Sequence, residues 1–201
     1  MKRLLVFGMN QKAMYHPLAG VDTFLEDILP DMELVFTENI LDVCEVAKFD
    51  GVISYWDDWN NPIPEEASDA LYSYVEQGGA LLALHNGISI QLQEPLKRMV
   101  GGYFLTHPAQ EEITFVLKEN ELTEGCGNFS LMEEPYQFAL EEDSKEIFMT
   151  YVYRGEEYPA GWKKDFGKGK VVFLTPGHTA EKFRNEEYTK LIQNCARYLF
   201  S

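Results

Sequence analysis

The feature of this chain that most constrains its fold is a series of short, nearly uninterrupted apolar runs in its first half. They are Leu4 to Phe7, Leu34 to Phe36, Val52 to Tyr55 and Ala80 to Leu84. Each run is short enough to be a strand, and continuous hydrophobicity is typical of strands that are covered on both faces in a parallel sheet. The runs therefore predict a mainly parallel sheet with helices on both sides.

Helix signals lie between and after these runs. One helix is predicted from about Leu18 to Leu29, where Pro30 ends it, and another opens at Pro64 and stops at Gly78-Gly79. A last helix closes the chain. Its apolar stripe consists of Phe183, Tyr188, Leu191, Ile192, Cys195 and Leu199. Strands that alternate with helices imply right-handed crossovers and a doubly wound α/β sheet.

The second half of the chain is richer in strand signals. Gly167 to Lys170 has the composition of a hairpin turn. The predicted strands are 112–117, 135–140, 147–152, 161–164 and 171–174. Because no linker, repeat or low-complexity segment divides the chain, we expect one domain over residues 1–201 with an added β-rich segment.

Charge and cysteine content restrict the partners and the compartment. The chain has 33 acidic and 17 basic residues, a net charge of −16, which repels phosphate backbones and anionic lipids. We therefore expect neither nucleic acid nor membrane as a partner. Three cysteines without a CxxC spacing, and an N-terminal apolar run too short for a signal peptide, indicate a cytoplasmic protein. An apolar helix face leaves a homo-oligomer open, although no feature demands one.

A histidine follows the apolar run that ends at Leu84. His85, Asn86 and Gly87 form a polar turn there, and a strand–turn–helix junction lifts a side chain above the carboxyl edge of the sheet, where ligands bind in α/β folds. Histidine at such a point is an acid, a base or a metal ligand. The alternative is a histidine that only caps the next helix or bonds loop backbone.

Two more histidines have comparable settings. His178 follows the predicted strand 171–174 through a Pro-Gly turn, so a parallel strand would bring it to the same edge as His85. Two imidazoles there would suit an acid–base pair or a metal site. Alternatively, Thr179 simply caps the following helix. His107 precedes a proline after a Gly-Gly pair and is either a site residue or a loop residue without a role.

Aromatic and acidic residues complete the candidates. The segment from Tyr55 to Trp59 combines aromatic rings with carboxylates after a strand, which suits sugar rings or, alternatively, packing on the sheet edge. His16 follows the first strand by eight residues and could overhang the same edge. Glu133 and Glu134 lie beside Tyr136, although an acidic pair in so acidic a protein is usually solvated surface.

In their order along the chain, these segments resemble the trehalose-utilisation (ThuA-like) family. The matching segments are Gly78 to Gly87, Gly101-Gly102 before His107-Pro108, Glu133-Glu134 with Tyr136, Pro159 to Trp162, Gly167 to Gly169 and Gly177 to Thr179. The family's acidic pair usually begins with Asp, whereas this chain has Glu133. Glu134 matches directly and is the carboxylate expected to act.

The resemblance implies a flavodoxin-like core related to class I glutamine amidotransferases. Those enzymes have a nucleophilic cysteine where this chain has His85, so glutamine hydrolysis would have no nucleophile here. The resemblance also implies carbohydrate catabolism, with a disaccharide or a keto-sugar derivative as the small-molecule ligand.

The resulting hypothesis is an enzyme in which His85, His178 and Glu134 are catalytic. The residues expected to contact the substrate are His107, Tyr136, Tyr55, Trp59 and Asn86. The cofactor is unknown; one version has a divalent metal such as zinc held by His85, His107 and His178. A second hypothesis is a non-catalytic sugar-binding or regulatory protein. A third, a thiol-dependent hydrolase, requires Cys126 to approach His178.

Overall fold

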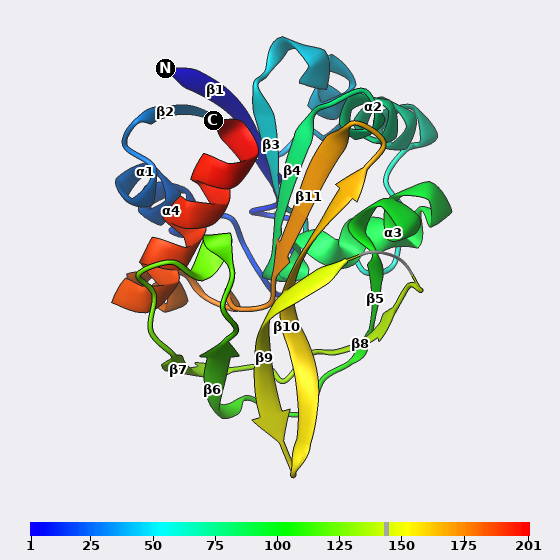
Figure 1. Cartoon of the computed structure of the whole chain (residues 1–201). Coiled ribbons are helices and arrows are strands. Elements are labelled where there is room, and N and C mark those ends of the chain that lie inside the picture. The colour runs from blue at the N-terminus through cyan, green and yellow to red at the C-terminus, as the bar shows by residue number, and fades with distance from the viewer. Residues whose placement is uncertain (143–144) are drawn as a thin grey trace.

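A nine-stranded sheet runs through the computed structural model, which describes residues 1–142 and 145–201 (Figure 1). Five parallel strands form one side of it, in the order β2-β1-β3-β4-β11. They are β1 (Lys2–Gly8), β2 (Met32–Thr37), β3 (Gly51–Tyr55), β4 (Ala80–Leu84) and β11 (Gly169–Leu174). Every residue of β3 and β4 is buried, which confirms that these two apolar runs are strands covered on both faces, whereas the run Leu34 to Phe36 forms the partly buried edge strand β2.

Helices cover both faces of this parallel part (Figure 1). They are α1 (Val21–Ile28), α2 (Glu65–Glu76), α3 (Glu94–Val100) and α4 (Glu186–Phe200). Along β1, Leu4 and Val6 belong to the core under α1 and α4, whereas Leu5 and Phe7 belong to the core under α2 and α3. Successive side chains of β1 therefore point into two apolar layers, one on each face of the sheet, as predicted. Helix α1 begins later than expected because Gly20 before it has a φ of 89°.

The second half of the chain extends the sheet with antiparallel strands. Strand β10 (Glu156–Phe166) pairs with β11, and β9 (Glu146–Tyr153), β6 (Glu111–Leu117) and β7 (Phe129–Glu133) follow outward. The pair Phe166–Gly169 closes the predicted hairpin turn. Strands β5 (Gly102–Thr106) and β8 (Gln137–Leu140) form a separate two-stranded sheet. Neither β5 nor β7 was predicted, since both are short and partly exposed.

Short 3-10 segments make the remaining connections. They are η1 (Ile40–Lys48), η2 (His85–Leu92), η3 (Glu121–Thr123) and η4 (Ala180–Arg184). Because β1, β3, β4 and β11 are parallel neighbours, the loops that follow them leave the sheet at one edge. Strand β2 lies on one side of β1 and β3 lies on the other, so the direction of strand addition reverses between β1 and β3. This reversal places the topological switch point at this edge.

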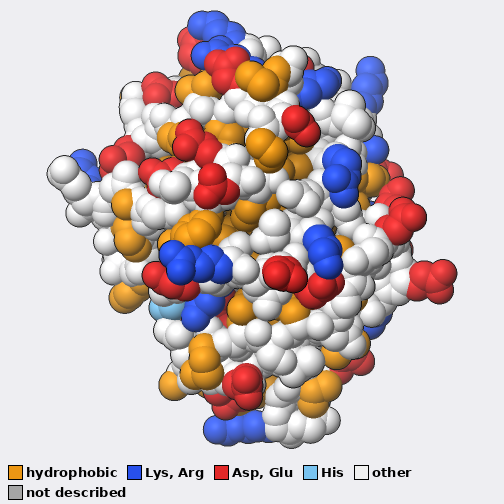
Figure 2. Space-filling model, turned by 90° about the vertical axis from the view of Figure 1, so that its left-hand side faces the viewer, with side chains coloured by type: hydrophobic (Ala, Val, Ile, Leu, Met, Phe, Trp, Pro, Cys, Tyr) orange, Lys and Arg blue, Asp and Glu red, His pale blue; other side chains and the backbone are white. Residues whose placement is uncertain are grey.

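The surface carries charged side chains of both signs. Figure 2 shows the side that carries α1 and α4, where carboxylates lie among lysine and arginine side chains. None of the helices within residues 1–142 and 145–201 is both long and apolar enough to cross a membrane.

Gly87, in the turn after β4, allows that turn to approach strand β3 closely at the carboxyl edge. A Cβ atom there would lie 2.0 Å from the backbone carbonyl oxygen of Ser54, which cannot move independently of β3. We expect Gly87→Ala to lower the free energy of unfolding by about 3 kcal/mol or more through overpacking. Gly127→Ala is the control, because its Cβ would meet nothing closer than 3.5 Å. Equal denaturation midpoints for the two variants would contradict this packing.

Candidate active site

His85 is held at the end of β4 in an unusual backbone conformation. Its φ is 46°, a region that non-glycine residues seldom occupy, and its side chain is fully buried. The Nδ1 atom lies 2.6 Å from the carbonyl oxygen of Thr175, which only accepts hydrogen bonds. His85 therefore carries its proton on Nδ1, and the lone pair on Nε2 faces the interior of the site.

His16 reaches the same point from the loop after β1. Its Nδ1 lies 2.7 Å from Oδ1 of Asp57, which follows β3. The other oxygen of Asp57 accepts hydrogen bonds from the backbone nitrogens of Tyr15, at 2.6 Å, and His16, at 2.9 Å. A carboxylate that fixes one imidazole nitrogen leaves the other available as a ligand or base, so Asp57 orients Nε2 of His16 into the site.

His178 follows β11 and is positioned by Glu133. One oxygen of Glu133 accepts hydrogen bonds from the backbone nitrogens of Gly177, at 2.8 Å, and His178, at 3.2 Å. Its other oxygen accepts a bond from the backbone nitrogen of Glu134 at 2.9 Å. Glu133 thus ties the end of β7 to the loop after β11. This buried carboxylate is a positioning residue.

Glu134 lies at the centre of the three imidazoles. Its Oε2 atom is 3.2 Å from Nδ1 of His178, 3.5 Å from Nε2 of His85 and 3.8 Å from Nε2 of His16. The same oxygen is buried and makes no hydrogen bond of normal geometry. Such an orphaned carboxylate oxygen among imidazole lone pairs needs a positive charge beside it.

The spacing of these four atoms fits a single cation. Nε2 of His16 lies 3.0 Å from Nδ1 of His178 and 3.3 Å from Nε2 of His85. All four ligand atoms of His16, His85, Glu134 and His178, here called the histidine–glutamate cluster, lie within 4.8 Å of one another. Ligands about 2.0 Å from a tetrahedral zinc ion are separated by about 3.3 Å, and the distances given above, from 3.0 to 3.8 Å, approach that geometry.

Tyr136 adds a buried hydroxyl to the cluster. Its Oη atom lies 3.1 Å from Nε2 of His85, and the two rings stack with centroids 4.5 Å apart. Burial, with the negative charges of Glu134 and Glu133, raises the pKa of Tyr136 well above its ordinary value. The phenol therefore keeps its proton and can donate a hydrogen bond.

The pKa values of His16 and His85 are shifted in opposite directions. Burial lowers the pKa of His16, but its hydrogen bonds to Asp57 and Glu134 outweigh that effect and raise the pKa to about 8. Burial dominates at His85 and lowers its pKa. Burial also opposes the charge on Glu134, yet its contacts with His16, His178 and His85 hold the pKa of this carboxyl well below the usual range. At neutral pH the cluster combines a carboxylate with both charged and neutral imidazole.

A cavity of about 630 Å³ opens onto the cluster and is here called the aromatic pocket. Buried His16, Glu134 and Tyr136, with partly exposed His178, form its floor. Its wall includes Trp59 and Phe104, whose rings lie 4.8 Å apart. Its exposed rim consists of Tyr15, Leu92, Tyr103, Leu105 and His107. The pocket gives a small molecule a route to the polar floor.

The structure brings most predicted site residues together. His85, His178 and Glu134 belong to the cluster, and Tyr136, Trp59 and His107 line the pocket. His107 is outside the cluster: its Nδ1 bonds the carbonyl oxygen of Pro108 at 2.8 Å and stays 3.7 Å from Oε1 of Glu134. His16 takes the place that His107 had in the predicted metal set. The sequence signal for His16 was its position in the loop after the first strand.

Two residues predicted to contact a substrate have another position. Tyr55 is fully buried and its hydroxyl donates to the carbonyl oxygen of Gly177 at 2.6 Å. Asn86 is also fully buried, and its amide donates to the carbonyl oxygen of Tyr55 at 2.7 Å. Substrate contact does not fit these positions, since neither side chain reaches the pocket surface. Both instead fix the loops that carry His85 and His178.

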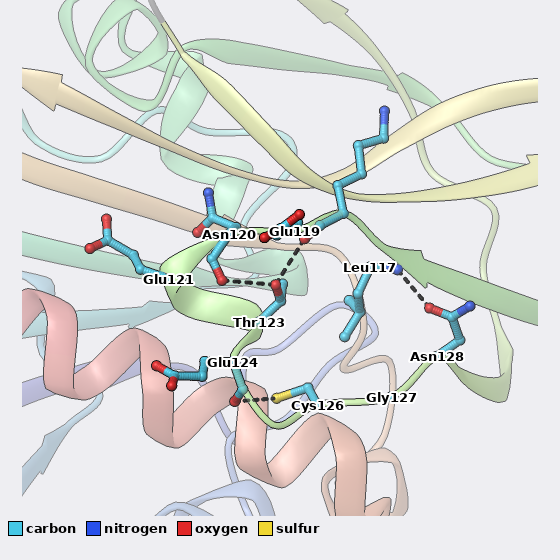
Figure 3. Close-up of a pocket in the computed structure, with 10 residues that line it drawn as sticks. Leu117, Glu119, Asn120, Glu121, Thr123, Glu124, Cys126, Gly127 and Asn128 are labelled. Carbon is cyan, nitrogen blue, oxygen red and sulfur yellow. Dashed lines mark hydrogen bonds between the residues drawn. The ribbon is translucent and has the colours of Figure 1, made fainter.

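The thiol of Cys126 belongs to a different region. It lies 3.8 Å from the carbonyl oxygen of Glu124 and 3.5 Å from the amide of Asn194, and burial raises its pKa. Figure 3 shows it in a second cavity around η3, where Asn128 and Thr123 bond neighbouring backbone. The histidine–glutamate cluster contains no cysteine in the described part of the chain. A thiol-dependent reaction with His178 does not fit this arrangement.

The fold defines a class of protein. A mainly parallel, doubly wound sheet with helices on both faces, here with His85 at the junction after β4, is a flavodoxin-like, glutamine-amidotransferase-like α/β architecture. Within that class, the chain belongs to the trehalose-utilisation (ThuA) family, whose sequence model matches residues 3–199. Among curated proteins, no sequence match was found.

Solved structures share the architecture. A protein described as ThuA-like from Bacteroides uniformis ATCC 8492 is 16% identical with a TM-score of 0.77, covering 98% of this chain and 90% of its own. A cytoplasmic protein from Salmonella typhimurium LT2 is 14% identical with a TM-score of 0.70, covering 99% and 100%. A β-galactosidase from Bacillus circulans sp. alkalophilus is 14% identical with a TM-score of 0.68, covering 97% and 30%. At these identities the similarity concerns the fold alone.

The pKa values of the cluster predict how the metal-free protein responds to pH. The pKa of His16 is 6.5 when unfolded and about 8 when folded, so its stabilisation is complete below pH 6.5 and is lost as the pH rises through 8. That loss amounts to about 2 kcal/mol. His85 and Glu134 have lowered pKa values, so their contributions are lost as the pH falls. We therefore expect chelator-treated protein to be most stable near pH 6.5.

Denaturant unfolding at a series of pH values measures this profile. His16→Gln is the control variant, because it removes the raised pKa and should abolish the loss of stability on the alkaline side. A free energy of unfolding that stays constant between pH 6.5 and 8.5 in the unmodified chain would contradict the assigned hydrogen bond to Asp57.

Proposed function

We propose that this protein is a carbohydrate-processing enzyme whose histidine–glutamate cluster holds a divalent cation such as zinc. Its ligand would be a disaccharide or a keto-sugar derivative, and its place of action the cytoplasm. The sugar class rests on membership of the trehalose-utilisation family. The cation rests on one observation, the approach of three imidazole nitrogens and a carboxylate oxygen to within 4.8 Å of one another.

The donor set supports a cation on chemical grounds. His16 and His85 each commit Nδ1 to an acceptor, so both present an Nε2 lone pair to the same point. Without a cation or a proton, these lone pairs and the Oε2 atom of Glu134 would repel one another in a buried site. Three imidazoles with one carboxylate suit zinc and also nickel or iron. A bound cation would polarise a sugar carbonyl or hydroxyl.

The surrounding residues would orient the sugar and donate hydrogen bonds to it. Trp59, on the pocket wall, offers a ring beside the cluster, which suits the apolar face of a sugar ring. The hydroxyl of Tyr136 would donate a hydrogen bond to a developing negative charge on a substrate oxygen. His85 and His178, bound to the cation through Nε2 and Nδ1, would keep their protons on the opposite ring nitrogens.

One observation favours a second candidate function. Four protein ligands close a tetrahedral zinc site, and closed sites are usually structural. In that case the protein would bind a sugar without converting it, and the cation would stabilise the carboxyl edge. The aromatic pocket weighs against this alternative because it reaches the cluster at His16, Glu134 and His178, where an added oxygen ligand has access.

Metal content and turnover test the proposal together. We expect tag-free protein to contain close to one divalent ion per chain by elemental analysis, and His178→Ala to lose both this ion and turnover of keto-sugars or disaccharides. His107→Ala is the matched control, since this histidine lines the pocket outside the cluster, and it should retain the ion.

The outcomes separate the candidates. Bound metal without turnover, together with a large loss of thermal stability on chelation, would support the sugar-binding alternative. Metal-free protein that cannot be reconstituted with zinc, nickel, iron or manganese would overturn the cation. Loss of metal in His107→Ala but not in His178→Ala would overturn the assigned ligands.

A further inference from the structure

The mouth of the aromatic pocket exposes several large apolar or aromatic side chains. Tyr15, Leu92, Tyr103 and Leu105 are exposed by 66%, 37%, 37% and 56%, and all four line this one pocket. Exposed apolar side chains that gather at one place usually mark a binding surface. The polar cluster lies on the floor beneath them, so the pocket changes from polar to apolar from the inside outward.

Two polar side chains of the lining are already engaged with the protein. Oε1 of Gln91 accepts a bond from the backbone nitrogen of Phe104 at 2.6 Å, and Nε2 of Gln91 donates to the carbonyl oxygen of Phe104 at 3.4 Å. The indole nitrogen of Trp59 donates to Asp57 at 3.0 Å. The polar atoms that remain at the described rim are the hydroxyls of Tyr15 and Tyr103 and the imidazole of His107. A sugar ring that faces Leu92 and Leu105 would leave its own hydroxyls on that side unpaired, which weakens binding.

The charge of the chain narrows the outer group further. A net charge of −16 disfavours an anionic group near this surface. A neutral aromatic or branched aliphatic group would instead pack against Leu92, Leu105 and the ring of Tyr103. Such a group buries apolar surface on both sides and leaves no hydroxyl unpaired.

We infer that the preferred ligand is a sugar derivative of the glycoside class, in which the sugar carries a neutral, apolar group. The sugar occupies the polar floor, and the aromatic or aliphatic group lies against Leu92, Tyr103 and Leu105 at the mouth. This inference rests on the proposed sugar-binding role of the pocket and adds the class of substrate.

Calorimetric binding of three ligands to the full chain tests the inference. Phenyl glucoside, methyl glucoside and trehalose share a glucose unit, and both glucosides are measured in both anomeric forms. We expect phenyl glucoside to bind about tenfold more tightly than methyl glucoside, and trehalose to bind no more tightly than methyl glucoside. In Leu105→Ser and Leu92→Ser, the ratio of the phenyl to the methyl affinity should fall at least threefold, with the affinity for methyl glucoside unchanged.

Val152→Ser is the matched control, because Val152 is 62% exposed and lies on β9 away from the pocket lining. Equal affinities for the two glucosides, tighter binding of trehalose, or no binding of any ligand would overturn the inference. The inference would also be overturned if the rim binds a second copy of the chain. Leu105→Ser would then dissociate an oligomer without changing the affinity ratio. Absence of metal or turnover leaves the affinity ratio measurable, so failure of the proposed function is seen separately.

Discussion

The arrangement of the loops at the carboxyl edge depends on the electrostatic balance around Oε2 of Glu134. This buried oxygen has three imidazole nitrogens within 3.8 Å and no hydrogen bond of normal geometry. Such a group is tolerated only where positive charge compensates it. A cation shared by the cluster, or a proton on His16, supplies that compensation. The cation explains the near-tetrahedral spacing as well, whereas protons alone do not require it.

The fold holds this balance through contacts between loops that are distant in sequence. Asp57 after β3 fixes His16 after β1, and Glu133 at the end of β7 fixes the loop that carries His178 after β11. The carbonyl oxygen of Thr175 fixes His85. Each imidazole thus has a partner on a different strand or loop, so the cluster forms only when the parallel sheet and its antiparallel extension are both in place. Rigid strands with precisely bonded loop residues are what a preorganised site requires.

The sequence predicted what local patterns determine. The continuous apolar runs became the buried strands, the Gly167 turn became a hairpin, and the polar turn after Leu84 placed His85 at the edge. Contacts between irregular loops could not be predicted, because no local pattern links His16 to Asp57, which lies 41 residues further along the chain. Tyr55 was predicted both as the end of the buried run Val52 to Tyr55 and as a substrate contact, and the structure agrees only with the first, because its hydroxyl bonds the carbonyl oxygen of Gly177. The short strands β5 and β7 carry exposed residues that obscure their pattern.

The most direct measurement of the central claim is a crystal structure of the tag-free protein, with anomalous diffraction data collected above and below the absorption edge of the metal found. The account predicts one anomalous peak about 2.0–2.2 Å from Nε2 of His16, Nε2 of His85, Nδ1 of His178 and an oxygen of Glu134. A peak at another position, or a cluster bridged only by water in metal-supplemented crystals, would contradict it.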